Sequence, residues 1–317
     1  MLFCGIAAAN FSRPGPTNKP TDVFIAIYVM DLDNVSSADQ NFTANVLVKA
    51  IWHDDRLKHK SAGNIRKKLS EIWHPRLQFV NQQRLWSTFD KIVSVAPDGT
   101  VTLRQRVWGD FSQPLELKKF PFDHQTFNIQ IVPIGYEHDE VRLLQDPNTP
   151  SDMADKFSVA DWKIQNFDAK PFNYYPYNDG KYMQGFQFSL HAKRKSNYFI
   201  TTIIIPLILI VMMSWTVFWI DPKQSGTQMS VAMTTMLTLI AFRFAVVSSL
   251  PNISYLTKMD VIILGSTILV FASLIEVVAT SSLAQSGRLE LARLIDKRVS
   301  RWLFPLAFII TFLFAIF

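Results

Sequence analysis

The sequence predicts a protein of two parts, an all-β sandwich of the immunoglobulin-like type followed by an all-α membrane domain of four helices. Two observations predict this division. Charged residues are spread through residues 1–195, whereas residues 198–317 are mostly apolar. In the first part, short runs that alternate apolar and polar side chains are separated by turn residues. We therefore expect one domain over residues 1–197 and a second over residues 198–317.

The strands expected in the first domain rest on this alternation, which points successive side chains to opposite faces of a sheet. The runs that show it are Asp22–Met30, Phe42–Trp52, Thr100–Trp108, Gln125–Val132 and Gly185–Ala192. Several short strands with turns between them are typical of a β-sandwich. Ser61–Leu69 fits either a short helix or a loop.

Four apolar runs predict the membrane domain: Tyr198–Ile220, Met229–Leu250, Val261–Ala284 and Trp302–Phe317. The first three reach the length of about 20 residues that a span needs. The fourth is short, unless its helix begins earlier, in the amphipathic stretch Arg288–Arg301. That stretch is rich in Lys and Arg, which places it in the cytoplasm. We expect a multi-pass protein of the cell (inner) membrane, in contact with lipid, with its N-terminal domain extracellular or periplasmic.

The second apolar run keeps a polar face that contact with lipid does not require. Steps of three and four residues place one set of side chains on a single helical face: Ser230, Thr234, Leu237, Ala241, Phe244 and Ser248. Hydroxyl rings beside apolar constrictions indicate an ion pore whose gate works by dewetting. The alternative is that the hydroxyls bond to carbonyls of their own helix or to neighbouring helices.

Composition excludes several classes of protein. The net charge of +6 comes from scattered basic residues, so we expect no nucleic-acid partner. Cys4 is the single cysteine, so no disulfide forms within the chain. His53, Asp54 and Asp55 lack metal-ligand spacing, and we expect no metal, no cofactor and no enzyme. Residues 1–16 fit either a signal-peptide remnant or a short N-terminal extension.

Three motifs in order carry a resemblance to a known family. They are Trp52-His53-Asp54-Asp55-Arg56-Leu57, then Trp73-His74-Pro75 with Asn81, then Phe120-Pro121-Phe122-Asp123-His124-Gln125, and a first apolar run with Pro206 follows them. Together with the hydroxyl-lined second run, they resemble the pentameric ligand-gated ion channels of the Cys-loop receptor superfamily. The animal receptors flank the third motif with two disulfide-bonded cysteines. Here Gln113 and Phe127 hold those positions, which is similar to the prokaryotic members.

The resemblance implies a homopentamer in which five copies of the second span line a pore for inorganic ions. It implies an agonist that is either a small molecule or a proton. The inner mouth, Gly226-Thr227-Gln228, has neither the glutamate of cation-selective animal members nor the Pro-Ala-Arg stretch of anion-selective ones. The missing Pro-Ala-Arg stretch and the similarity to prokaryotic members lead us to expect monovalent cations. Arg243 lies about 100° off the pore face on a helix. Glu276 is an ionisable residue at membrane depth and needs a partner.

The resemblance also implies residues that couple the outer domain to the pore: Asp123, His124, Arg194 and Pro251. Asp123 and Arg194 can form a bidentate ion pair. Alternatively, Asp123 accepts bonds from its own loop and Arg194 flanks the lipid headgroups. Because histidine titrates near neutral pH, His124 is the hypothetical sensor if protons open the channel.

The ligand site implied by the family is a box of aromatic residues between subunits. Three of its positions fall here on Leu47, Val80 and Ile134, so the box must be formed differently. The aromatic residues available nearby are Phe79, Tyr136, Tyr174, Tyr175 and Tyr177. These five are the expected ligand contacts, although the tyrosine-rich loop could instead pack on a neighbouring subunit. Trp52 and Trp73 are expected in the core.

The main alternative to a channel is a membrane-anchored β-sandwich sensor without a conducting pore. A passive anchor gives no reason for Ser230 and Thr234 to share a helix face with Leu237 and Phe244. The second apolar run therefore favours the channel.

Overall fold

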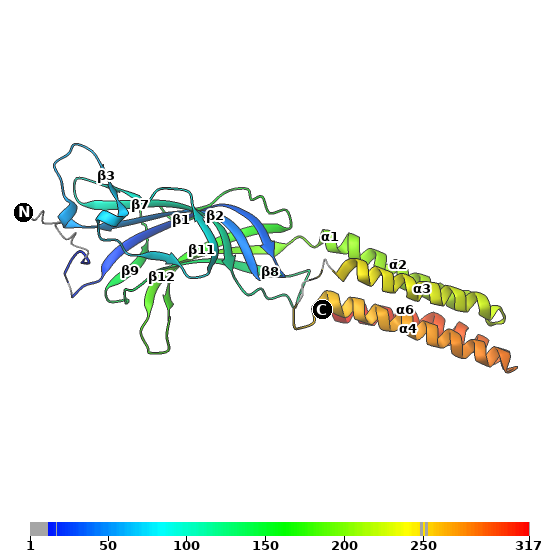
Figure 1. Cartoon of the computed structure of the whole chain (residues 1–317). Coiled ribbons are helices and arrows are strands. Elements are labelled where there is room, and N and C mark those ends of the chain that lie inside the picture. The colour runs from blue at the N-terminus through cyan, green and yellow to red at the C-terminus, as the bar shows by residue number, and fades with distance from the viewer. Residues whose placement is uncertain (1–11, 17, 248–249, 251–252, 317) are drawn as a thin grey trace, which may run out of the picture. The chain divides into compact units, whose positions relative to one another are not determined.

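The computed structural model describes residues 12–16, 18–247, 250 and 253–316 (Figure 1). Most of the possible signal-peptide remnant, and the predicted residues Ser248 and Pro251, lie outside this part. The chain forms two compact units. The first comprises the residues up to Leu115 and His124–Lys193, and the second comprises Glu116–Asp123 and the chain from Arg194 onward. The boundary thus lies slightly before the expected one, and a loop of the N-terminal half belongs with the helices.

The first unit consists of strands with two short 3₁₀ turns, η1 (Asp55–Leu57) and η2 (Leu69–Glu71). The strands are β1 (Thr21–Ser36), β2 (Asn41–His53), β3 (Ile65–Lys68), β4 (Leu77–Phe79), β5 (Gln82–Ser87), β6 (Ile92–Val95), β7 (Thr100–Ser112), β8 (His124–Pro133), β9 (Val141–Gln145), β10 (Asp152–Met153), β11 (Trp162–Tyr174) and β12 (Met183–Arg194).

Nine of these strands form one continuous hydrogen-bonded path in the order β3-β6-β7-β2-β1-β9-β12-β8-β4. The other three pair with members of the path: β5 with β7, β10 with β1 and β11 with β12. The path folds over on itself, because residues of distant strands meet in the core. Phe42 on β2 lies 5.2 Å from Phe127 on β8, and Phe79 on β4 lies 5.6 Å from Phe111 on β7, between ring centroids. The two halves are therefore the layers of a sandwich, which confirms the predicted fold class.

All five predicted strands are present, and Trp52 and Trp73 are buried in the core as expected. The prediction of a helix or loop at Ser61–Leu69 is wrong in part, since β3 pairs with β6 there. This strand is short and lies at the end of the sheet path, so its sequence carries little alternation. Strand β11 was missed for a related reason, because it pairs only with β12 and buries little beyond Trp162.

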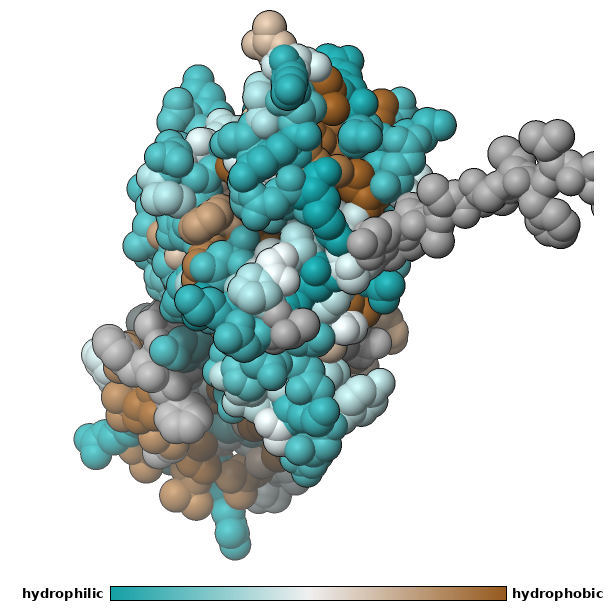
Figure 2. Space-filling view, turned by 90° about the vertical axis from the view of Figure 1, so that its left-hand side faces the viewer, coloured by the Kyte–Doolittle hydropathy of each residue, from teal (hydrophilic) through white to brown (hydrophobic). Residues whose placement is uncertain are grey.

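The surface of the first unit suits contact with water. In the upper part of Figure 2, hydrophilic residues predominate and hydrophobic residues form small patches between them. Its buried residues are the apolar members of the alternating strands, as in β2, where every second side chain faces the core.

The second unit is helical. Its elements are α1 (Asn197–Phe199), the π-type turn η3 (Ile200–Ile204), α2 (Ile205–Thr216), the 3₁₀ turns η4 (Val217–Trp219) and η5 (Pro222–Gln224), α3 (Ser225–Val246), α4 (Lys258–Gln285), α5 (Leu289–Leu294), the π-type turn η7 (Ile295–Ser300) and α6 (Arg301–Ile316).

Three helical stretches of the described chain are long and apolar enough to cross a membrane: Asn197–Trp219, Pro222–Val246 and Lys258–Gln285. Helix α6 has 16 residues, and α5 and η7 lead into it without a break. The fourth helix thus begins in the amphipathic stretch, as its short apolar run required. Its crossing of the membrane remains a prediction.

Candidate functional site

A cavity of about 310 Å³ opens in the first unit between the turn after β8 and the loop joining β11 to β12. Its lining combines aromatic and charged side chains: Gly135, Tyr136, Glu137, Pro176, Tyr177, Asp179, Lys181, Tyr182 and Met183. We call it the tyrosine pocket. It brings together Tyr136 and Tyr177, two of the five expected ligand contacts.

The other three expected contacts lie elsewhere. Phe79 is 8% exposed and packs against Phe111, so it belongs to the core of the sandwich. Tyr174 packs edge-on against Phe172 at the end of β11. Tyr175 is exposed and lies 5.5 Å from Tyr182, which places it beside the pocket rather than in its lining.

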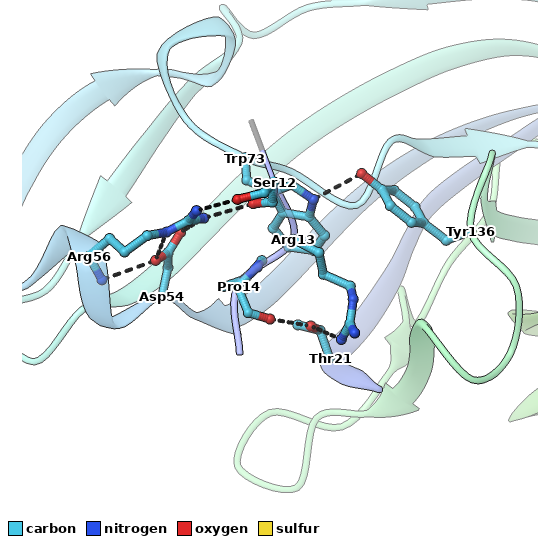
Figure 3. Close-up of polar contacts among 8 residues, drawn as sticks. All are labelled: Ser12, Arg13, Pro14, Thr21, Asp54, Arg56, Trp73 and Tyr136. Atoms are coloured by element: carbon cyan, nitrogen blue, oxygen red, sulfur yellow. Dashed lines mark hydrogen bonds and ion pairs between the residues drawn. The ribbon is translucent and has the colours of Figure 1, made fainter. Parts of the chain in front are cut away.

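Core tryptophans hold Tyr136 in position. The indole Nε1 of Trp73 donates a hydrogen bond of 2.9 Å to the Tyr136 hydroxyl (Figure 3). The Trp73 ring in turn packs edge-on against Trp52, 6.2 Å away. Both tryptophans are buried, so the tyrosine ring is fixed by the rigid part of the sandwich. The pocket wall is therefore preorganised.

The charged residues of the tyrosine pocket were missed from the sequence. The Lys181 ammonium pairs with the Glu137 carboxylate, and this hydrogen bond raises the pKa of Lys181. The Lys181 backbone amide donates to Asp179. Two carboxylates and one ammonium beside three tyrosine rings favour a cationic ligand. In the sequence, the one hint of these charges was that Glu137 directly follows Tyr136. No local pattern shows that the loop between β11 and β12 lies close to the turn after β8.

The motif around Asp54 is structural. The Asp54 carboxylate accepts hydrogen bonds from the backbone amide and the guanidinium of Arg56, and Arg56 also reaches the carbonyl of Ser12 (Figure 3). The motif therefore ties the N-terminal segment to the turn η1. In the described part of the chain, no group of three or more His, Cys, Asp or Glu residues could hold a metal ion.

The predicted pair between Asp123 and Arg194 is present. Nε of Arg194 donates to one carboxylate oxygen at 2.8 Å and its NH2 group donates to the other at 3.1 Å. Both side chains are buried, and the guanidinium carbon lies 5.0 Å from the centroid of the Phe120 ring. This geometry excludes the alternative in which Arg194 is a free flank at the headgroups.

The loop Glu116–Asp123 is fixed to the helices at several points. The Tyr255 hydroxyl accepts from the amide of Leu117, and the amides of Lys258 and Met259 donate to the carbonyls of Lys118 and Phe120. At the other side, the Phe120 ring packs against Phe199 at 4.8 Å. The loop thus contacts the end of α1 at Phe199 and the start of α4 at Lys258 and Met259. His124, the next residue, is exposed at the start of β8, opposite Lys193.

Helix α3 has two distinct faces. Its buried residues are Gln228, Ala232, Thr235, Leu239 and Val246. The predicted pore residues within the described chain are all exposed: Ser230, Thr234, Leu237, Ala241 and Phe244. Leu237 is 68% exposed and Phe244 76%. Large apolar side chains of other helical segments are similarly exposed, such as Leu209 at 60% and Trp302 at 76%, and lipid, a partner or a lumen can cover such groups.

Hydroxyls of α3 donate hydrogen bonds to carbonyls of their own helix, as the alternative to a pore lining predicted. Thr234 donates to the carbonyl of Ser230, and Thr238 donates to that of Thr234, each at 2.8 Å. A hydroxyl that donates along its helix still presents its oxygen as an acceptor. The exposed face therefore offers acceptor oxygens beside the apolar side chains of Leu237 and Phe244.

The comparisons with known proteins agree with this fold. The family described as neurotransmitter-gated ion-channel ligand binding domain matches residues 9–196, and the family described as neurotransmitter-gated ion-channel transmembrane region matches residues 203–289. The chain belongs to this family, the pentameric ligand-gated ion channels of the Cys-loop superfamily, whose members are channels and not enzymes.

Two curated relatives illustrate the range of similarity. The human gamma-aminobutyric acid receptor subunit rho-3 is 29% identical over 281 residues, covering 86% of this chain and 60% of the receptor. A proton-gated ion channel of Gloeobacter violaceus is 28% identical over 306 residues, covering 94% of this chain and 84% of the channel. The chain thus spans about three fifths of the length of the receptor subunit.

Proposed function

We propose that five copies of this chain form a gated ion channel in a cell membrane, with α3 lining the pore. The observation that carries the proposal is the exposed face of α3, where Leu237 and Phe244 alternate with hydroxyl and small side chains. Five such helices around an axis would form apolar constrictions that exclude water until the helices move apart. A helix that only anchors a sensor in the membrane does not require hydroxyl and large apolar side chains on one face, so this face of α3 favours the channel.

We further propose that the pore prefers monovalent cations. Support comes from the inner mouth, where residues 225–230 contain no basic side chain to attract anions. The test is a voltage-clamp recording of the full chain expressed in oocytes, with the reversal potential measured in a NaCl gradient. Reversal near the sodium potential supports the proposal. Reversal near the chloride potential contradicts the selectivity, and a surface-expressed protein without current under any agonist supports the sensor instead.

The tyrosine pocket is the proposed agonist site, and a small amine is the proposed class of agonist. Tyr136, Tyr177 and Tyr182 offer ring faces, and Glu137 and Asp179 supply negative charge. We expect Glu137→Gln to weaken amine activation about tenfold, because a charge-assisted contact contributes about 1.5–3 kcal/mol. The measurement is the half-activating concentration. Asp161→Asn, at an exposed position outside the pocket, is the matched control, and an equal shift in both variants would contradict the site.

Protons are the second candidate agonist, since one relative carries the name proton-gated ion channel. His124 is the proposed sensor, because it is exposed and directly follows Asp123 of the coupling pair. A new charge there would act within a few residues of the Asp123–Arg194 contact. The test is the pH dependence of the current in His124→Phe, and an unchanged dependence removes His124 from the proposal.

A further inference from the structure

A cluster of polar side chains is buried at the end of the helix bundle that the distribution of basic residues places in the cytoplasm. Gln228, in the first turn of α3, is 0% exposed and donates its amide to Asp296 of η7 at 3.1 Å and to the carbonyl of Ile220 at 2.9 Å. Ser300, also in η7, donates to Glu276 of α4 at 2.8 Å. This polar cluster therefore joins three elements: the first turn of α3, helix α4 and η7, which leads into α6.

Within the described part of the chain, the two carboxyl groups of the cluster have one oxygen each that no donor reaches. These atoms are Oε2 of Glu276 and Oδ1 of Asp296, and both are buried. The two side chains lie within hydrogen-bonding reach of one another. Ionised carboxylates only accept hydrogen bonds, and two of them cannot share a dry site without strong repulsion. A single proton between the two groups removes the repulsion and gives both orphaned oxygens a partner.

The surroundings decide which group carries this proton. Burial opposes ionisation of Asp296, but this group accepts the Gln228 amide and is attracted by the positive guanidinium of Arg301, so it ionises more readily than Glu276. Asp221 opposes this from η5, but its charge is paired with Arg293 of α5 at 3.1 Å. Among the described residues, the Ser300 hydroxyl is the one donor to Glu276. The charge therefore belongs on Asp296 and the proton on Glu276.

We propose that Glu276 and Asp296 form a proton-binding site. The proton stays on Oε2 of Glu276, and this O–H group donates a hydrogen bond to Oδ1 of Asp296. The bound proton joins α4 to η7, and through Gln228 it anchors the foot of α3. Removal of the proton leaves two adjacent negative charges and releases this anchor. The proton site itself is independent of conduction, whereas its effect on current rests on the proposed channel function.

Infrared spectroscopy of the full-length protein in liposomes tests the site directly, because a protonated carboxyl group has a carbonyl stretching band that a carboxylate lacks. We expect this band at neutral pH in the unmodified protein and its loss at alkaline pH. Glu276→Gln should remove it, because the glutamine amide donates the hydrogen bond to Asp296 without a titrating proton. Asp296→Asn should shift its frequency, because the Glu276 carboxyl then donates to a neutral amide oxygen. Asp221→Asn, which neutralises an exposed carboxylate at the same end of the bundle, should leave it unchanged. Absence of the band at neutral pH, or its survival in Glu276→Gln, overturns the proposal.

Inside-out membrane patches test the consequence for the pore. At constant external pH, raising the pH on the cytoplasmic side should change the agonist-evoked current of the unmodified protein, and Glu276→Gln should abolish this response. A response that persists unchanged in Glu276→Gln overturns the link between the proton site and α3. If no agonist evokes current, the channel proposal fails and the infrared band alone decides the proton site.

Discussion

At the scale of single residues, Asp123 and Arg194 form a buried ion pair in the second unit. Both charges are buried and joined by two hydrogen bonds. We expect Asp123→Asn to destabilise the protein by about 3–5 kcal/mol, because it leaves the Arg194 charge buried without a counter-charge. The measurement is thermal or denaturant unfolding of the detergent-solubilised protein, together with the agonist response.

The exposed pair between Glu290 and Arg293 provides the control, since Glu290→Gln should change stability by less than about 1 kcal/mol. Equal effects of the two substitutions would contradict a special role for the buried pair. A loss of agonist response in Asp123→Asn at temperatures where the protein stays folded would support coupling rather than stability alone.

Some site residues could be predicted from the sequence, and others could not. Asp123 and Arg194 stand in a recognisable motif and at the start of an apolar run, so their meeting could be expected from the resemblance. Glu137 and Lys181 belong to no recognisable motif and do not lie at the border of an apolar run. Their ion pair depends on the loop after β11 returning to the turn after β8. Phe79 was misplaced because an aromatic residue beside a family position looks the same whether it faces the core or the surface.

At the scale of elements, the side chain of Gln113 joins the end of β7 to β8. Its side-chain amide donates to the carbonyl of Thr126 and accepts from the amide of Asn128 at 2.7 Å. These two residues flank Phe127 in β8. The end of β7 is thus fastened to β8 by two hydrogen bonds on one side chain.

We expect Gln113→Leu to destabilise the protein by about 1–3 kcal/mol, because it leaves two backbone groups of β8 without their partner. The measurement is the midpoint of unfolding, followed by tryptophan fluorescence. Gln82→Leu, at an exposed position of β5, is the control and should change the midpoint little. A neutral Gln113→Leu would mean that water replaces the side chain and that the fastening is incidental.

Elements with strong periodicity were predictable, and elements whose form depends on neighbours were not. The alternating runs of β2 and β8 and the three long apolar helices follow from local pattern alone. The edge strands β3 and β11 bury few side chains, so their sequences do not distinguish them from loops. The fourth helix contains a π-type turn at Ile295–Ser300, which places Asp296 and Ser300 toward the other helices and left no trace in the apolar pattern.

At the scale of the whole molecule, one copy of the chain leaves large apolar side chains of α3 without a partner. Leu237, Phe244 and Met233 are each more than half exposed. Covering these groups favours association, and the family to which the chain belongs associates as pentamers. In such a ring the helix face with Leu237 would surround the axis, so a change at Leu237 reports on the pore and not on packing within one copy.

We therefore expect Leu237→Ser to produce a standing current without agonist, because a polar ring lowers the cost of wetting the narrowest apolar part of the pore. The measurement is the holding current of oocytes with matched surface expression, and its block on replacing permeant ions with large ones. Ile240→Ser is the control, since Ile240 is also exposed on α3 but lies off the predicted pore face. If the standing current arises in Ile240→Ser and not in Leu237→Ser, the pore face is rotated and the assignment of Ser230, Thr234, Leu237, Ala241 and Phe244 is wrong. If it arises in Leu237→Ser alone, the apolar ring is the gate, and the proton site at the foot of the same helix is placed to influence it.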